Sequence, residues 1–289
     1  MTTTAPAGTS VPAAGPRVVP GMPEAEYHAH PALSSTGARK LLACPAKFAY
    51  EREHGSTPTT AMERGTAAHL AVLGVGPDLV IVDAPDWKTK TAREKRDAAR
   101  ADGAVPLLAH EYEHSQAMAE ALRQHPVAGP LFAPGTGTAE VSLFWTDPDT
   151  GVECRARIDW LRHPVPGRRL IISDYKTTTD ASPEGIARSI AAYGYHQQGD
   201  WYMAGAEACG LAPDGAAFLL IFQEKQAPYL VTVAQLAPSD LMLAAARNAR
   251  ARELFRDCTA SGVWPGYADE PLIIQQPKWA ALRDEEYLL

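Results

Sequence analysis

The sequence predicts an α/β domain in which a mixed central β-sheet is flanked by helices, and three observations lead to this class. The 289 residues are 46% hydrophobic, which is enough for a sizeable core. Three strand-like segments follow one another in the middle of the chain, and two more come later. Helical segments lie before, between and after these strands, which is the order expected for a mixed sheet with helices packed on it.

The first 25 residues differ in composition from the rest of the chain. They are rich in Pro, Ala, Thr and Gly and poor in large apolar side chains. Such a segment buries too little surface to offset the entropy lost on ordering. We therefore expect a disordered tail over residues 1–25 and a single domain over residues 26–289.

The sequence of the first half of the domain predicts mainly helices. Ser34 or Ser35 can cap the first helix, which Pro45 interrupts or restarts. The next helix ends at Gly74, a residue that favours helix C-termini. This helix is expected at residues 62–73, and a short strand follows at 79–83. Two further helices are expected at 88–103 and 109–125.

The middle of the chain predicts a β-hairpin and a third strand. In residues 138–147, Val141 and Leu143 share one face and Glu140 lies on the other. A D-P-D-T-G turn signal follows, and then a second alternating segment that ends near Asp159. The third strand covers residues 169–176. Helices at 183–191 and 195–209, strands at 216–224 and 228–234, and a helix at 238–257 complete the chain.

Charge and cysteine content limit the class of protein. The net charge is -7, so the chain lacks the overall basic footprint of many nucleic-acid binders, although positive charge can be concentrated in one groove. The four cysteines contain no C-x-x-C pair, which favours free thiols in a reducing compartment.

No apolar run of ~20 residues and no signal pattern is present, so a cytoplasmic protein without a membrane partner is expected.

The pattern Ile158-Asp159 and Asp174-Tyr175-Lys176 predicts a metal site on neighbouring strands. Residues i and i+2 of a strand point to the same side, so Asp174 and Lys176 share a face. Mg²⁺ prefers carboxylate oxygens, and a lysine beside them can polarise the attacking water. Taken alone, a D-x-K pattern is more often an exposed ion pair than a catalytic site.

Other residues extend this pattern. Glu140 lies on a preceding strand, and His69 lies on an upstream helix. Gln198 and Tyr202 are four residues apart and share one helix face. Each has an ordinary structural explanation when taken alone: a solvated strand residue, a packed histidine and a helix-surface pair.

Together, these residues resemble a known family. The ordered set G-x-x-x-H (65–69), Glu140, I-D (158–159), D-Y-K (174–176) and Q-x-x-x-Y (198–202) resembles the RecB/RecE-like branch of the PD-(D/E)xK nucleases. The RecE-type, phage-associated exonuclease domain is the nearest match, from about Tyr27 to Trp279. The stretch D-Y-K-T-T-x-D-A-S-P is its most specific part. Asp174 stands where many relatives have Glu, and Ile158 replaces the proline of the superfamily's name.

The resemblance implies a restriction-endonuclease-like fold and a set of roles. It implies Mg²⁺, with Mn²⁺ as a substitute, held by His69, Glu140, Asp159 and Asp174. Lys176 would be the catalytic lysine, and Gln198 and Tyr202 would orient DNA or the lysine. Some relatives carry an iron–sulfur cluster, but only Cys44 fits its pattern, so none is expected.

The resemblance also implies an activity and partners. It implies 5′→3′ degradation of one strand of linear duplex DNA in a bacterium or phage-infected cell, often by a ring-shaped homo-oligomer. A single-strand annealing recombination protein would be a partner. A single-strand or structure-specific nuclease like the CRISPR-associated branch, a catalytically dead DNA-binding module, and a metal-dependent hydrolase of another substrate are the alternatives.

Basic residues predict where DNA would be contacted. Arg157 lies on the strand face of Asp159, two residues away. Ser35 and Arg39 lie at a helix start that could bind a 5′-phosphate, although simple capping is the more ordinary explanation. Three arginines share a face of the charged helix and fit either a DNA contact or a solvated surface: Arg93, Arg96 and Arg100.

Overall fold

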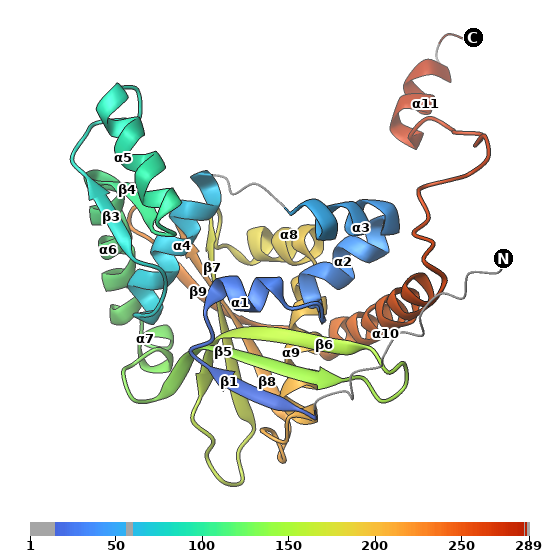
Figure 1. The fold of residues 1–289 in the computed structure, drawn as a ribbon, viewed down its shortest axis with the longest axis horizontal. Helices are drawn as coiled ribbons and strands as arrows, with labels where there is room; N and C mark the ends of the chain where they lie inside the picture. The colour runs from blue at the N-terminus through green and yellow to red at the C-terminus, as the bar shows by residue number, and fades with distance from the viewer. Residues whose placement is uncertain (1–14, 56–59, 286, 288–289) are drawn as a thin grey trace, which may run out of the picture.

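A seven-stranded mixed β-sheet forms the centre of the computed structural model, which describes residues 15–55, 60–285 and 287 (Figure 1). Its strands follow the order β1-β5-β6-β7-β8-β9, and β2 pairs with β6 beside this path. The β7–β8 and β2–β6 pairs are parallel, and the other pairs are antiparallel. The strands are Arg17–Pro20 (β1), Leu33–Ser34 (β2), Gly137–Thr146 (β5), Glu153–Arg162 (β6), Leu170–Thr178 (β7), Ala216–Glu224 (β8) and Val231–Gln235 (β9).

Helices pack on both faces of this sheet. Helix α9 lies against β5, β6 and β8, and α10 packs on α9 and α2, whereas α4 packs against β7 and α6. The helices are Glu24–Ala29 (α1), Ser35–Ala43 (α2), Pro45–His54 (α3), Thr60–Leu73 (α4), Lys90–Ala101 (α5), Ala109–Gln124 (α6), Ala128–Leu131 (α7), Pro183–Tyr193 (α8), Tyr195–Ala208 (α9), Pro238–Ser261 (α10) and Lys278–Glu285 (α11). This arrangement confirms the predicted α/β class with a mixed central sheet. No helix in the described part of the chain is both long and apolar enough to cross a bilayer.

The predicted hairpin and the strands that follow it form as expected. β5 and β6 pair along nearly their whole length, joined by a turn at Asp147–Gly151. Asp147 organises this turn because its Oδ2 accepts hydrogen bonds from the backbone N and the hydroxyl of Thr150, at 3.0 and 2.6 Å. β7 then crosses to its parallel neighbour β8 through α8 and α9, since parallel strands need a long connection.

The expected tail boundary at residue 25 is wrong. Arg17–Pro20 form edge strand β1, which pairs antiparallel with residues 141–144 of β5, and α1 begins at Glu24. The segment has few large apolar groups, but its backbone groups complete the ladder of β5 and Val19 packs beside Phe144. Composition alone does not predict such an edge strand. Residues 1–14 lie outside the described residues.

The strand predicted at 79–83 forms, but it does not belong to the central sheet. Leu79–Val82 (β3) pairs in parallel with Val105–Leu108 (β4), and the two make a small second sheet beside α5 and α6. The sequence did not predict β4, because its four residues contain Pro106 and show no alternation. Figure 1 shows this small sheet and α5 at the outer edge of the molecule, beyond α4.

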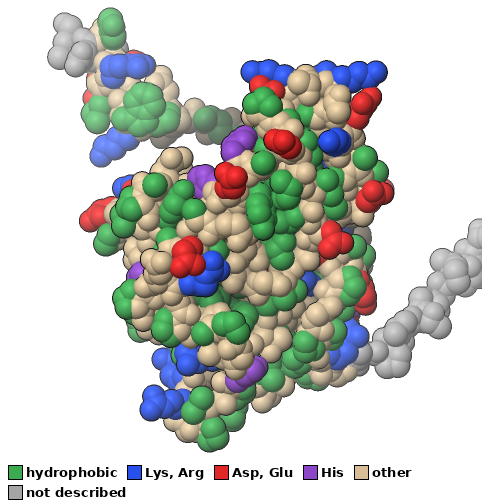
Figure 2. Space-filling view, turned by 90° about the vertical axis from the view of Figure 1, so that its left-hand side faces the viewer, with side chains coloured by type: hydrophobic (Ala, Val, Ile, Leu, Met, Phe, Trp, Pro, Cys, Tyr) green, Lys and Arg blue, Asp and Glu red, His purple; other side chains and the backbone are tan. Residues whose placement is uncertain are grey.

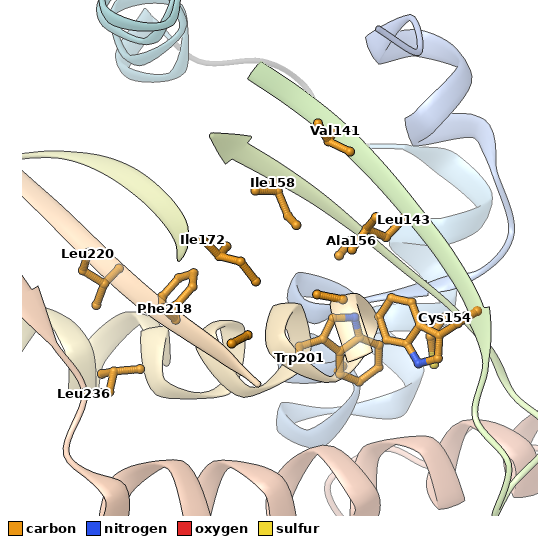
Figure 3. Packing of buried hydrophobic residues seen from close by; sticks show 14 of the residues in the cluster. Val141, Leu143, Cys154, Ala156, Ile158, Ile172, Trp201, Phe218, Leu220 and Leu236 are labelled. Carbon is orange, nitrogen blue, oxygen red and sulfur yellow. The ribbon is translucent and has the colours of Figure 1, made fainter. Parts of the chain in front are cut away.

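Two apolar clusters meet at the centre of the sheet. The larger one includes Ile158 and Trp201 and lies between the sheet, α2, α9 and α10 (Figure 3). The second contains Trp160 and Tyr175 and lies under α4, α6 and α7. On β5, Ala139 belongs to the second cluster and Val141 to the first. Glu140 and Asp159 therefore lie where the sheet passes from one cluster to the other.

Candidate metal centre and active site

The predicted acidic residues lie where β6 and β7 separate. These strands pair at Leu161–Ile172 and Trp160–Ser173, and the pairing stops there. Asp159 and Asp174 occupy the next position on each strand. The Oδ2 atom of Asp159 accepts a hydrogen bond of 2.9 Å from the backbone N of Tyr175, which bridges the gap. The separation of two hydrogen-bonded strands thus leaves room for their carboxylates.

Three of the four predicted metal ligands form a cluster. One donor atom each from His69, Glu140 and Asp159 lies within 4.8 Å of the others. The Nδ1 atom of His69 is 3.6 Å from Oδ2 of Asp159, and the imidazole ring packs edge-on against Tyr175 at 5.2 Å between ring centroids. Helix α4 therefore delivers the imidazole to the carboxylates of β5 and β6.

Glu140 reaches the cluster through an unusual backbone conformation. Its φ angle is 52°, in the left-handed region that a residue with a side chain seldom adopts. The β5–β6 ladder pairs Ala139 with Trp160 and Val141 with Ile158, and it skips the Glu140–Asp159 position between them. Backbone strain of this kind costs on the order of 1–3 kcal/mol and is concentrated at functional sites.

Arg157 holds Glu140 in place. Its guanidinium forms an ion pair with Oε2 of Glu140 and donates a 2.8 Å hydrogen bond to the carbonyl oxygen of Met22. The two side chains of the ion pair are only 16% and 18% exposed. The sequence predicts a DNA contact for Arg157, whereas the structure gives it these protein partners. A contact with DNA remains a prediction.

Replacing Arg157 by methionine is expected to destabilise the protein by on the order of 3 kcal/mol, because it leaves a partly buried carboxylate without its cation. Urea unfolding followed by circular dichroism would measure the loss. Adding Glu140→Gln to Arg157→Met should recover much of it, since the unpaired charge is removed. A double variant as unstable as Arg157→Met would show that Arg157 acts through other contacts.

Asp174 and Lys176 form the second half of the site. The Asp174 side chain is fully buried, and its Oδ2 atom forms an ion pair with Nζ of Lys176. Its Oδ1 atom accepts a 2.8 Å hydrogen bond from Nε2 of Gln198, which also donates to the hydroxyl oxygen of Tyr202 at 3.0 Å. The i, i+4 pair of α9 therefore orients the carboxylate of β7. Asp174 lies outside the three-residue cluster, so its role as a metal ligand stays a prediction.

The electrostatics of the site fit a divalent cation. Burial raises the pKa of Asp159 to about 6, against the lowering effect of Lys176. Burial and the charge of Asp159 raise the pKa of Asp174 to about 6. Burial lowers the pKa of His69, and Lys176 lowers it further, so the imidazole is neutral and able to ligate. Burial lowers the pKa of Lys176, but the carboxylates of Asp174 and Asp159 outweigh it and raise the value overall.

The balance of charges at the site also favours binding of a divalent cation. Three carboxylates face two cations, Lys176 and Arg157, and a neutral imidazole, which leaves a net negative site. Two carboxylates and one imidazole whose donor atoms lie within 4.8 Å of one another can hold a divalent cation. The donor set therefore fits a divalent metal ion, which is the class of cofactor that the sequence predicts.

Tyr195 is a site residue that the sequence analysis missed. Its ring lies 5.1 Å from Nζ of Lys176 and covers the ammonium group. It precedes Gln198 by three residues and Tyr202 by seven, so all three share one face of α9. That spacing is a signal by which the sequence could have identified Tyr195.

The predicted 5′-phosphate residues lie on α2, near the site. Ser34, rather than Ser35, caps this helix, accepting a 3.1 Å hydrogen bond from the backbone N of Gly37. Ser35 is buried, and its hydroxyl has no hydrogen-bond partner among the described residues. Burial lowers the pKa of Arg39, while Tyr202, Tyr195 and Asp174 act in the opposite direction. Arg39 also donates to the backbone oxygen of Tyr193.

The three arginines of α5 lie on a different part of the molecule. The Arg96 guanidinium lies 6.0 Å from the Trp87 ring centroid and pairs with Asp97 at 2.9 Å. Arg100 is 4.0 Å from the same carboxylate, and Arg93 is exposed. The structure does not bring them into the metal cluster, and a DNA contact for this helix stays a prediction.

The fold and the arrangement of these side chains define a member of the PD-(D/E)xK nuclease superfamily. Within it, the chain belongs to the family described as the PDDEXK-like domain of unknown function (DUF3799), whose model matches residues 34–277. This match confirms the predicted superfamily and its restriction-endonuclease-like fold. A search of curated proteins found no match.

The fold of this chain is similar to that of a solved structure. A candidate exonuclease from Eubacterium rectale superimposes with a TM-score of 0.57 at 11% sequence identity, covering 91% of this chain and 96% of that chain. A phage-related exonuclease from Haemophilus somnus 129PT gives a TM-score of 0.35 at 13% identity, covering 81% of this chain and 97% of that chain. At these identities the likeness concerns the fold, and the first match alone is strong enough to support it.

Proposed function

We propose that this protein is a metal-dependent DNA exonuclease that degrades linear duplex DNA in the 5′→3′ direction. The observation that carries the proposal is the clustering of His69, Glu140 and Asp159 beside the Asp174–Lys176 ion pair. A family of PDDEXK-like domains supports nuclease chemistry, and the structural neighbour from Eubacterium rectale is described as an exonuclease.

The cation would be held by His69, Glu140 and Asp159, with Asp174 as the further predicted ligand. Bound Mg²⁺ or Mn²⁺ supplies a hydroxide near neutral pH and positive charge at the scissile phosphate. The carboxylates must be deprotonated to bind it. Because burial raises the pKa of Asp159 to about 6, metal affinity should rise as the pH increases towards that value and level off above it.

Lys176 would act on the attacking water and the phosphate. Its Nζ atom can donate hydrogen bonds to both, because its position is fixed by the carboxylate of Asp174 and the ring of Tyr195. Gln198 keeps Asp174 oriented through Oδ1. Burial raises the pKa of Tyr202 well above its ordinary value, so its hydroxyl stays protonated near neutral pH. These groups are in place before substrate binds, which is the condition for electrostatic catalysis.

A 5′ end would be recognised on α2. Ser35 offers a hydroxyl without a partner among the described residues, and Arg39 offers a guanidinium beside Tyr195 and Tyr202. A terminal phosphate bound there would place the next phosphodiester bond at the metal cluster. We further propose a ring-shaped homo-oligomer and a single-strand annealing protein as partners, on the basis of the RecE-type resemblance.

One assay tests the activity and its polarity. Linear duplex DNA carrying a 5′-phosphate or a 5′-hydroxyl, and closed circular duplex, are incubated with Mg²⁺ or with a chelator. We expect nucleotides to be released from the labelled 5′ end of the phosphorylated linear substrate, only with metal, and the circle to stay intact. Equal cutting of the circle would indicate an endonuclease, and resistance of every substrate in both Mg²⁺ and Mn²⁺ would exclude nuclease activity.

A further inference from the structure

A cationic pocket lies at the closed end of the β6–β7 hairpin. It has a volume of about 330 Å³ and is lined by Arg162, His163, Val165, Arg168, Arg169 and Ile171. Figure 1 shows the β6–β7 loop projecting from the lower end of the sheet. Figure 2 shows Lys and Arg side chains at this lower end and at the top of the same view, with acidic side chains between them. The pocket is therefore a local concentration of positive charge in a protein whose net charge is -7.

The three guanidinium groups of this pocket are not neutralised by the protein. In the described part of the chain, no carboxylate oxygen lies within 4.0 Å of Arg162, Arg168 or Arg169. Many other surface arginines are paired, as in the Arg188–Asp180 and Arg250–Glu253 ion pairs. Unpaired guanidinium groups that converge on one cavity favour an anionic ligand.

The backbone fixes the position of these groups. Val165 and Arg168 close a turn through a 3.0 Å hydrogen bond between the Arg168 N and the Val165 oxygen, and Gly167 takes the φ angle of 70° that such a turn requires. His163 N donates to the Thr136 oxygen at 2.9 Å, and Nε of Arg169 donates to the Ala216 oxygen at 3.0 Å. The loop is thus tied to neighbouring parts of the sheet on both sides.

The lining determines the chemical class of the ligand. Apart from the imidazole of His163, the pocket contains no ring on which a nucleobase could stack, since Val165 and Ile171 are aliphatic. A guanidinium fork matches the oxygens of a phosphate. The pocket therefore fits a sugar–phosphate group rather than a base or a whole nucleotide.

The pocket is at a defined position relative to the metal cluster. Arg162 follows Asp159 by three residues on β6, and Ile171 precedes Asp174 by three residues on β7. Three residues of strand span ~10 Å, and an offset of three places Ile171 and Asp174 on opposite faces of β7. We propose that this pocket, formed by Arg162, Arg168 and Arg169, binds a backbone phosphate of the DNA. The inference rests on the proposed function, because it takes DNA as the substrate.

The salt dependence of binding tests this inference. The variant Arg162→Gln/Arg168→Gln removes two of the pocket's cations, and Arg250→Gln on α10 is the matched control. Binding of a labelled linear duplex is measured with Ca²⁺ in place of Mg²⁺, between about 50 and 200 mM salt. We expect the double variant to bind on the order of tenfold more weakly and to lower the slope of log affinity against log salt by ~1–2. The control should keep the wild-type slope.

The outcomes separate this inference from the proposed function. Cleavage of the same duplex by the wild-type protein with Mg²⁺ is measured in parallel. If the wild type cleaves and the double variant keeps its affinity and slope, the pocket assignment is wrong although the function holds. If the wild type binds with the expected sensitivity to Arg162 and Arg168 but does not cleave, the pocket stands and the nuclease proposal fails. Absence of both binding and cleavage overturns both.

Discussion

Lys176→Ala is expected to lower the rate of DNA cleavage roughly 10³-fold while leaving the cluster of His69, Glu140 and Asp159 intact. The ammonium group lies beside Asp174 and under the ring of Tyr195, so it is fixed at the site before the substrate binds. Removing a preorganised charge of this kind takes away stabilisation that is realised in the transition state. Single-turnover cleavage at about pH 8, above the raised pKa values of the acids, would measure the effect.

Loss of the ammonium group also leaves the buried Asp174 carboxylate without its cation. Part of any loss of activity could then come from unfolding, so rates are normalised to the folded fraction measured by circular dichroism. Binding of Mn²⁺ should remain within a few-fold of wild type. Lys225→Ala, at an exposed position just after β8, is the matched control and should leave the rate unchanged. A folded Lys176→Ala protein that cleaves at the wild-type rate would remove Lys176 from the catalytic site.

Asp159→Asn is expected to weaken Mn²⁺ binding by about 100-fold or more and at the same time to stabilise the metal-free protein at neutral pH. The first effect follows because the substitution removes one of the clustered carboxylates. The second follows because burial raises the pKa of Asp159 to about 6, so the charged form is disfavoured in the folded state. The amide can still accept the hydrogen bond from the Tyr175 backbone N.

The pH window of this stabilisation follows from the sign of the pKa shift. The folded pKa of about 6 lies above the unfolded value, so the folded wild-type protein holds a proton that the unfolded chain has lost between about pH 4 and 6. Its unfolding free energy therefore falls as the pH rises through this window. Wild type and Asp159→Asn should have similar stability at about pH 4 and differ by roughly 1–3 kcal/mol at about pH 7.

Thermal unfolding of both proteins in a chelator, at several pH values, measures this difference. A shift of that size corresponds to a rise of several degrees in melting temperature. Added Mn²⁺ should stabilise the wild type and have little effect on Asp159→Asn, which reverses their order. If the variant were less stable than the wild type at every pH and bound Mn²⁺ equally well, Asp159 would be a structural residue rather than a ligand.

Local sequence patterns determined much of the fold. The alternation of apolar residues through 138–162 and the D-P-D-T-G turn predicted the β5–β6 hairpin, and Gly74 predicted the end of α4, because these signals act over a few residues. The same patterns failed for β1 and β4. Both are short strands that contain proline. The partner of β1 is β5, which lies far away in the sequence, and the partner of β4 is β3, from which helix α5 separates it in the chain. Pairing of that kind leaves no periodicity in the strand itself.

The identity of the site residues also came from the sequence, whereas their arrangement came from the tertiary structure. The motif named His69, Glu140, Asp159, Asp174 and Lys176, and a strand's period of two placed Asp174 and Lys176 on one side. Only the folded chain showed that the β6–β7 pairing stops just before the two aspartates, and that Glu140 adopts a φ angle of 52° and pairs with Arg157. These features depend on packing between α4, α9 and the sheet, that is, on contacts between residues far apart in the chain. Side-chain periodicity describes one element at a time and carries no information about where two elements separate.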